Sequence, residues 1–250
     1  MKEEDALKVV EDTISHWDKV QEDSFALHKL FTNNHIQNPD STDIDFMTEV
    51  QDSLPDSLKG ARLTTELFNQ LKRFYISEKG KYSGSQAIKN VNLVSKIKGL
   101  DQEIVGHIDY LFVGEDGTLH LYLFKTTSTD PKSWPNIKEE KYKYQLAFLK
   151  QMLANNGVNV KNIDLNIVPV QLTYNDDFTK VQSINIHYPK PYSTRRSGSE
   201  YAMAKYDRQV KAFIEDNSIP FHISDKPIER ADEVNKAIFP EINIRTEGIA

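Results

Sequence analysis

The chain of 250 residues contains no cysteine, and this absence excludes both disulfides and thiolate metal sites. It also lacks any run of 18 apolar residues, so we expect no membrane-spanning helix. The first residues are acidic and carry no apolar segment, which predicts that no secretion signal is present. Together these absences favour a cytoplasmic protein.

Several common catalytic signatures are absent as well, namely a Walker loop, a dinucleotide-binding glycine motif and a nucleophile elbow. The composition, with 38% hydrophobic and 10% aromatic residues, suits one sizeable globular domain with appendages, or at most two small domains. Lysine far outnumbers arginine, and Asn and Ile are frequent. That bias is typical of an AT-rich genome such as that of a phage or mobile element, so a virus-associated protein is expected.

The formal net charge of −6 is distributed unevenly along the chain. Residues 1–60 contain 5 lysines and 14 acidic residues, a balance of −9, whereas residues 61–250 carry +3. The basic side chains fall into two groups: Lys72, Arg73, Lys79, Lys81, Lys89, Lys96 and Lys98, then Lys125, Lys132, Lys138, Lys141, Lys143 and Lys150. Local positive potential suits contacts with nucleic-acid phosphates, although lysines also simply solvate surface helices. The acidic first sixty residues would screen this basic part or bind a basic protein partner.

Hydrophobic periodicity predicts the order of the secondary-structure elements. Helices are expected over four segments: residues 5–31, Arg62–Ile76, Ile137–Asn155 and Glu200–Glu215. Strands are expected over five: Ala87–Ile97, Ile104–Val113, Leu119–Thr126, Ile163–Tyr174 and Val181–Tyr188. Hairpin-joined strands combined with a helical crossover predict an α/β fold with a mixed central β-sheet flanked by helices.

Three segments of different character are expected along the chain. Residues 1–60 form an acidic helical extension and a connector, with a short helix around Phe46–Val50. Residues 61–190 form the α/β core. Residues 191–250 form a helical C-terminal segment and a polar tail, and within it Arg195 and Arg196 either touch phosphate or belong to a solvated linker.

A metal-dependent phosphodiesterase site requires carboxylate ligands and a cation near the attacking water. Asp109 is an acid within an apolar strand, and Lys125 stands near the end of the next strand. An acid two residues before such a lysine would share its face of the strand, because side chains alternate with a period of two. Leu123 occupies that position.

The residues Gly106-x-x-Asp109, Lys125-Thr126 and Gln145 resemble the RecB-like branch of the PD-(D/E)xK nuclease superfamily over roughly residues 62–188. That branch reads Gly-x-x-Asp, a turn, Asp-x-Lys-Thr and then a Gln-x-x-x-Tyr helix. The resemblance implies a restriction-endonuclease-like core in which Asp109 binds Mg²⁺ and Lys125 is the catalytic lysine. By the same resemblance Gln145 lies near the phosphate and Glu66 is an upstream metal-binding acid. Lys141, from the second basic group, is a further candidate for substrate contact.

The sequence departs from this pattern at three positions. Leu123 replaces the second acid, Leu149 stands where an aromatic residue is expected, and Gln86 stands where an upstream glutamate would be. In some relatives the second acid has moved to the helix after the lysine. Glu139 or Glu140 would fill that role as metal ligands here, unless they are simply first-turn glutamates that favour the helix dipole.

Two functional hypotheses follow from the resemblance. In the first, the protein is a catalytically degenerate relative that needs no cofactor and acts as a nucleic-acid- or protein-binding component, with DNA the more natural ligand than RNA. In the second, it is an active Mg²⁺-dependent DNA nuclease with a relocated acid. The leucine at 123 favours the first, because it removes a charged metal ligand. Both require Asp109 and Lys125 to point into one pocket.

Five further side chains have two interpretations each. We expect His107 and His120 to be structural or surface residues, with His107 facing away from Asp109. The aromatic residues Trp134, Tyr142 and Tyr144 would either stack on bases or pack in the core.

Overall fold

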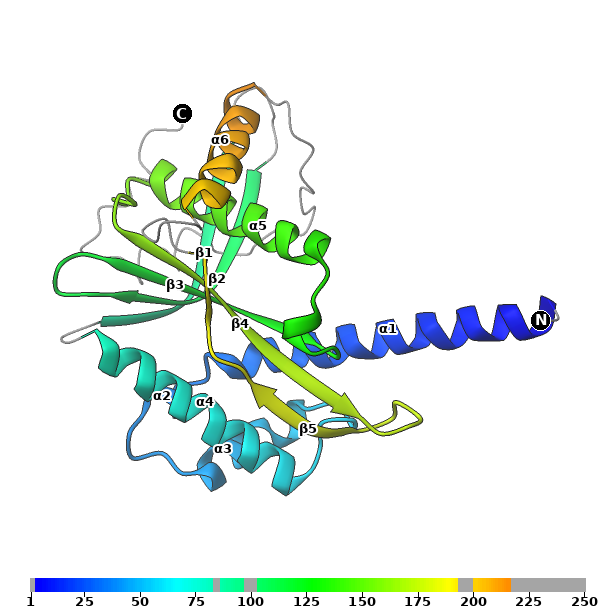
Figure 1. Ribbon diagram of the computed structural model, residues 1–250. Coiled ribbons are helices and arrows are strands. Elements are labelled where there is room, and N and C mark those ends of the chain that lie inside the picture. The colour runs from blue at the N-terminus through cyan, green and yellow to red at the C-terminus, as the bar shows by residue number, and fades with distance from the viewer. Residues whose placement is uncertain (1–2, 83–85, 97–102, 193–199, 217–250) are drawn as a thin grey trace. The chain divides into compact units, whose positions relative to one another are not determined.

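The computed structural model describes residues 3–82, 86–96, 103–192 and 200–216, and these residues form an α/β fold around a mixed sheet (Figure 1). The strands are β1 (Gln86–Lys96), β2 (Glu103–Val113), β3 (Leu119–Thr127), β4 (Ile163–Tyr174), β5 (Val181–Ile186) and β6 (Lys190–Pro191). Their order in the sheet is β1-β2-β3-β4-β5, and β6 pairs with β4. The pairs β1–β2, β2–β3 and β4–β5 are antiparallel. A helical crossover joins β3 to its neighbour β4, as parallel strands require. The predicted fold class is therefore confirmed.

The helices are α1 (Glu3–Phe31), α2 (Asn34–Gln37), α3 (Asp43–Val50), α4 (Ala61–Lys81), α5 (Asn136–Asn155) and α6 (Glu200–Asp216), with the 3-10 turns η1 (Gln51–Ser53) and η2 (Pro131–Ser133). The predicted connector thus contains short helices. One of them, α3, begins with a capping box in which Thr42 and Asp45 bond each other's backbone N–H groups. The helix α4 continues to Lys81, past the predicted end at Ile76.

The contacts within the chain divide it into two units. Unit 1 comprises Met1–Glu78, Phe124–Ser133 and Val168–Tyr188. Unit 2 comprises Lys79–Leu123, Trp134–Ile167 and Pro189–Ala250. The long strands β3 and β4 contribute residues to both units. The segment boundaries at 60 and 190 stay predictions, and Arg195, Arg196 and the tail after residue 216 lie outside the described residues.

In unit 1, α1 and α4 cover one side of the end of β3. Phe31 of α1 stacks on Phe124 at a ring-centroid distance of 4.5 Å, and Phe74 of α4 meets the same ring edge-on at 5.1 Å. Gln70 of α4 ties this helix to β5, because its amide donates to the carbonyl of Ile184 and accepts from the N–H of Ile186. An aromatic core and one side-chain bridge therefore fix α4 against the strands.

A buried carboxylate anchors α1 within unit 1. Asp23 is fully buried, and it accepts hydrogen bonds from the hydroxyls of Ser57 and Tyr174. The ammonium of Lys19 lies 3.6 Å from the same carboxylate. Burial, followed by the hydrogen bond to Asp23, raises the pKa of Tyr174. The carboxylate is thus satisfied by two donors and one cation, as a buried charge requires.

In unit 2, α5 packs on β1 and β2, and α6 lies beside α5 (Figure 1). An apolar cluster joins these elements, and its α5 members include Leu146, Leu149 and Met152. The polar edge of the α5–α6 contact contains the ion pair Lys150–Asp207 at 2.8 Å. Among the residues that the structure describes, no helix has the length and apolar content needed to cross a bilayer.

Candidate functional site

Asp109 lies in the middle of β2 and is only 2% exposed. Its Oδ1 atom is 3.6 Å from Nε2 of His107, a contact that becomes an ion pair when the imidazole is protonated. Nδ1 of His107 in turn lies 2.8 Å from the amide oxygen of Asn92 on β1. The expectation that His107 faces away from Asp109 is wrong, because the two side chains are in contact.

The side-chain alternation of β1 and β2 is interrupted next to Asp109. Ile108 and Leu111 both belong to the apolar cluster of unit 2 although they are three residues apart. Their partners on β1, Val91 and Ile88, show the same spacing. Between those partners, Asn90 adopts a left-handed conformation with φ of 52°, which asparagine tolerates better than most residues. A strict period of two therefore does not give the direction of the Asp109 side chain.

Leu123 follows Tyr122 on β3. The β2–β3 ladder pairs Leu111 with Leu121 and Tyr110 with Tyr122. The Leu123 side chain is 1% exposed and belongs to the apolar cluster that includes Leu146 and Leu149 of α5. Where the resembled family has a metal-binding acid, this chain therefore has a core residue.

Gly106, the first residue of the Gly-x-x-Asp motif, allows the close approach of α5 to β2. A Cβ atom at this position would lie 2.4 Å from Cδ2 of Leu149 and 2.8 Å from Sδ of Met152. Both side chains are buried, so they have little room to move away. This half of the motif has a packing role in the structure.

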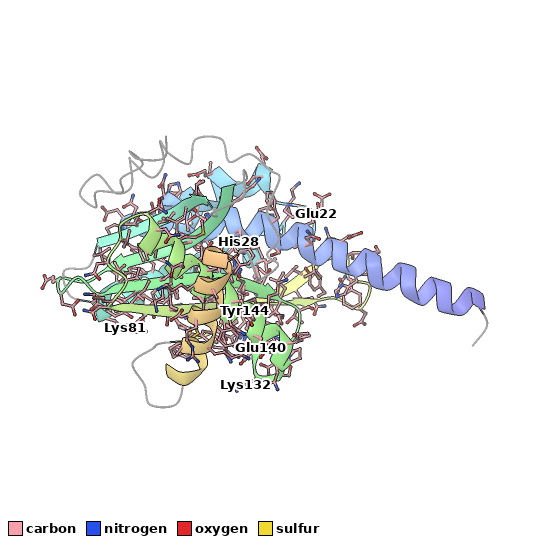
Figure 2. The ribbon with its side chains drawn as sticks, turned by 90° about the horizontal axis from the view of Figure 1, so that it is seen from above. Glu22, His28, Lys81, Lys132, Glu140 and Tyr144 are labelled. Carbon is pink, nitrogen blue, oxygen red and sulfur yellow. The ribbon has the colours of Figure 1, made fainter. Side chains whose placement is uncertain are left out.

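The remaining candidates of unit 2 lie on α5. Glu139 forms an ion pair with Lys190 at 3.1 Å, and Oε1 of Glu140 accepts a hydrogen bond from Tyr206 of α6 at 3.1 Å. Figure 2 shows Glu140 projecting from α5 beside α6. Gln145 is half-buried and Lys141 is exposed. The two glutamates proposed as relocated acids are thus engaged with partners of their own.

The other two candidates belong to unit 1. Lys125 is partly buried on β3, between Phe124, which packs on α1, and Thr126, whose hydroxyl contacts Ser24 of α1. Lys125 consequently lies on the face of the strand away from α1. Glu66 on α4 accepts a hydrogen bond from Gln70 at 3.2 Å, which helps to orient the bridge from Gln70 to β5. The catalytic and metal-binding roles of Lys125 and Glu66 stay predictions.

The donors of unit 2 do not fit a Mg²⁺ ion next to Asp109. Such an ion takes near-octahedral oxygen coordination and usually needs more than one protein carboxylate or a substrate phosphate. Leu123 is buried in the apolar cluster, and Glu139 and Glu140 are engaged elsewhere. Within the described parts of the chain, no group of three His, Asp or Glu side chains is arranged to hold a metal ion. The side chain of Gln86 is outside the described residues.

A cluster of lysines around Trp134 was not predicted as a unit. The ammonium groups of Lys138 and Lys190 lie 4.6 and 4.7 Å from the centroid of the indole, and Tyr142 meets it edge-on at 5.2 Å. Burial lowers the pKa of Lys138, and the charge of Lys190 lowers it further. Burial also raises the pKa of Tyr142 to about 12. Lys138 is close to Trp134 in the sequence, but Lys190 lies far away, in Pro189-Lys190-Pro191. Local pattern therefore could not predict that the two lysines meet at one ring.

A second polar feature of unit 2 surrounds His120. Its buried ring stacks on Tyr82 at 3.5 Å, and Nδ1 lies 3.0 Å from Oδ2 of Asp164 without a well-aligned hydrogen bond. Asp116 holds the adjoining hairpin turn through the N–H and hydroxyl of Thr118. These residues line a cavity of about 340 Å³. His120 is therefore a packed structural histidine at the edge of a small polar cavity.

Comparison with known proteins gives structural likeness only. No family model matches the chain, and no curated protein matches it. A solved structure described as "Putative exonuclease" from Eubacterium rectale is 12% identical, with a TM-score of 0.36, and the match covers 76% of this chain and 72% of that one. The structure of SSO0001 is 14% identical, with a TM-score of 0.32, over 72% of this chain and 73% of that one. Both scores are low, so this likeness carries no argument about function.

Proposed function

We propose that this protein is a catalytically silent relative of the PD-(D/E)xK nucleases that binds nucleic acid without cleaving it. The observation that carries the proposal is the position of Leu123, buried inside the apolar cluster that holds α5 on the sheet. An acid at this position would have to be desolvated among leucines unless a cation compensated it, at a cost of several kcal/mol. In this chain, Leu123 instead packs in the apolar cluster with residues of α5.

The binding part of the proposal rests on the start of α5. Lys141 is exposed there, and Lys138 and Lys190 lie close together around Trp134. Lysines gathered on one surface bind phosphates by releasing condensed counterions, so the affinity should fall steeply with salt. DNA is the ligand that the resemblance to nucleases favours.

The test of binding uses the full chain and fluorescence anisotropy of labelled DNA over a salt series. With two or three phosphates contacted, we expect log Kd to rise with log salt concentration with a slope of about 2 to 3. Lys141→Glu should weaken binding several-fold. Lys161→Glu is the matched control, because Lys161 is an exposed lysine in the loop before β4 and should leave Kd nearly unchanged. Absence of salt-dependent binding to single- or double-stranded DNA would reject the proposal.

The absence of catalysis is tested by measuring the length of the same DNA after incubation with the protein and Mg²⁺ or Mn²⁺. We expect the DNA to stay intact in both metals. Metal-dependent cleavage that disappears in Lys125→Ala would instead establish the active-nuclease hypothesis.

A further inference from the structure

The strand β5 ends the sheet on one side, as far as the described residues extend, and two of its backbone groups bind α4 (Figure 1). The amide nitrogen of Gln70 donates to the carbonyl of Ile184 at 2.6 Å. The N–H of Ile186 donates to the amide oxygen of Gln70 at 2.7 Å. A neighbouring strand would bind these same two groups, because an edge strand presents its outward carbonyl and N–H groups to the next strand. The side chain of Gln70 therefore takes the place of an added strand.

Further contacts from the α4 side hold this arrangement in position. The amide nitrogen of Gln70 also donates to Glu66, one turn earlier on the same helix, at 3.2 Å. At the other end of β5, the N–H of Val181 donates to the carbonyl of Ser57, which lies in the segment before α4, at 3.0 Å. The helix and the segment that precedes it therefore bind backbone groups near both ends of this strand.

The sequence of β5 suits pairing with an identical strand. Its six residues, Val-Gln-Ser-Ile-Asn-Ile, include no charge, no proline and no glycine, and three of them are β-branched. Short uncharged segments of this kind pair with the same segment of another chain when they lie on an open edge. No like charges would face each other in such a pair. The partner for which this edge is suited is therefore β5 of a second copy.

The strand at the other end of the sheet, β1, is protected in a different way. It contains Lys89 and Lys96, and lysines on an edge strand oppose pairing with another chain. Asn90 interrupts the strand with its positive φ of 52°. The amide of Asn156 also donates to the carbonyl of Val94, at 3.4 Å. Since β5 has neither a lysine nor a residue of positive φ, its protection depends on residues outside the strand.

We infer that the outer edge of β5 is a pairing surface for β5 of a second copy of this chain, and that the Gln70 bridge keeps this surface closed. The Gln70 bridge is the pair of hydrogen bonds that joins Gln70 to Ile184 and Ile186. Loss of the bridge leaves a carbonyl and an N–H without these partners, and a second strand would satisfy both groups. It also removes a polar link between α4 and the strand, so the edge can open. The inference does not depend on nucleic-acid binding.

The first arm of the experiment measures the assembly state of full-length variants by light scattering over a concentration series. Gln70→Met removes the donor and the acceptor but keeps the length of the side chain. It should form larger assemblies than the parent as the concentration rises through the micromolar range, where unpaired strand edges associate. Gln151→Met is the matched control, because the amide of Gln151 bonds Asn155 within α5, and it should keep the parent's state. The inference is overturned if Gln70→Met keeps the parent's state or if the control assembles equally.

The second arm separates edge pairing from a loss of stability. Gln182 is an exposed residue of β5, so adding Gln182→Lys to Gln70→Met places like charges in a self-paired edge. This double variant should return to the parent's assembly state although the Gln70 bridge is still absent. Its Ile186 amide should exchange at least about 10-fold faster than in the parent, because neither Gln70 nor a second strand accepts from it. Assemblies that persist in the double variant, or unchanged exchange at Ile186, would overturn the inference.

Discussion

At the scale of a single residue, Gly106 allows α5 to pack closely on β2. We expect Gly106→Ala to lower the free energy of unfolding by about 1–3 kcal/mol, because its Cβ would collide with the buried ends of Leu149 and Met152. Gly80→Ala is the control, since nothing lies within 4 Å of a Cβ there and the residue is helical. That change should be neutral or stabilise by up to about 1 kcal/mol. Urea unfolding measures both, and equal stability of the two variants would contradict the packing role.

The sequence indicated candidate site residues, whose roles stay predictions, but it did not indicate their surroundings. Asp109 and Leu123 were singled out by the resemblance and by their spacing, and both are buried. The side-chain alternation is interrupted at Asn90, but nothing in the sequence distinguishes this asparagine from an ordinary strand residue. The partners of Glu139 and Glu140, Lys190 and Tyr206, are more than fifty residues away in the chain and were therefore not predictable from local pattern.

At the scale of elements, local rules predicted the long helices and the hairpin well. The β2–β3 hairpin turns between Gly114 and Gly117, and Gly117 has a positive φ of 74°. α5 ends at Asn155, as predicted, and Gly157 just beyond it has a positive φ of 83°. The short helices before α4 were underestimated, because segments of four and eight residues show too little periodicity.

The docking of α6 on α5 is a prediction at this scale. Val210 is fully buried in the apolar cluster, so Val210→Asp should detach α6 by placing a charge among apolar side chains. Ala204→Asp is the control, because it adds the same charge to an exposed position of the same helix. Hydrogen exchange should show at least about 10-fold loss of protection across α6 in Val210→Asp alone, equivalent to about 1.4 kcal/mol. Unchanged protection in that variant would show that α6 does not depend on this contact.

At the scale of the whole molecule, buried tyrosines predict a loss of stability at alkaline pH. Burial raises the pKa of Tyr142 from 10 to about 12, and burial also raises the pKa values of Tyr174 and Tyr192. The unfolded chain ionises its tyrosines from about pH 10, whereas the folded chain keeps these three protonated, so their contribution is fully present below pH 10. It should be lost as the pH rises from 10 toward 12 and beyond.

This alkaline loss is measured by urea unfolding at a series of pH values, with tyrosinate absorbance recorded in parallel. The free energy of unfolding should fall across this range, and Tyr142→Phe should reduce the slope. A flat profile between pH 10 and 12 would contradict the buried state of these phenols.

The central claim is that position 123 has changed from a metal ligand to a core residue, and calorimetric titration with Mn²⁺ tests it most directly. We predict no heat of binding for the parent chain, and measurable binding for Leu123→Asp but not for the neutral control Leu123→Asn, because only the aspartate restores the charged oxygen ligand that the resembled family has at this position. Tight Mn²⁺ binding by the parent that is lost in Asp109→Asn would contradict the account.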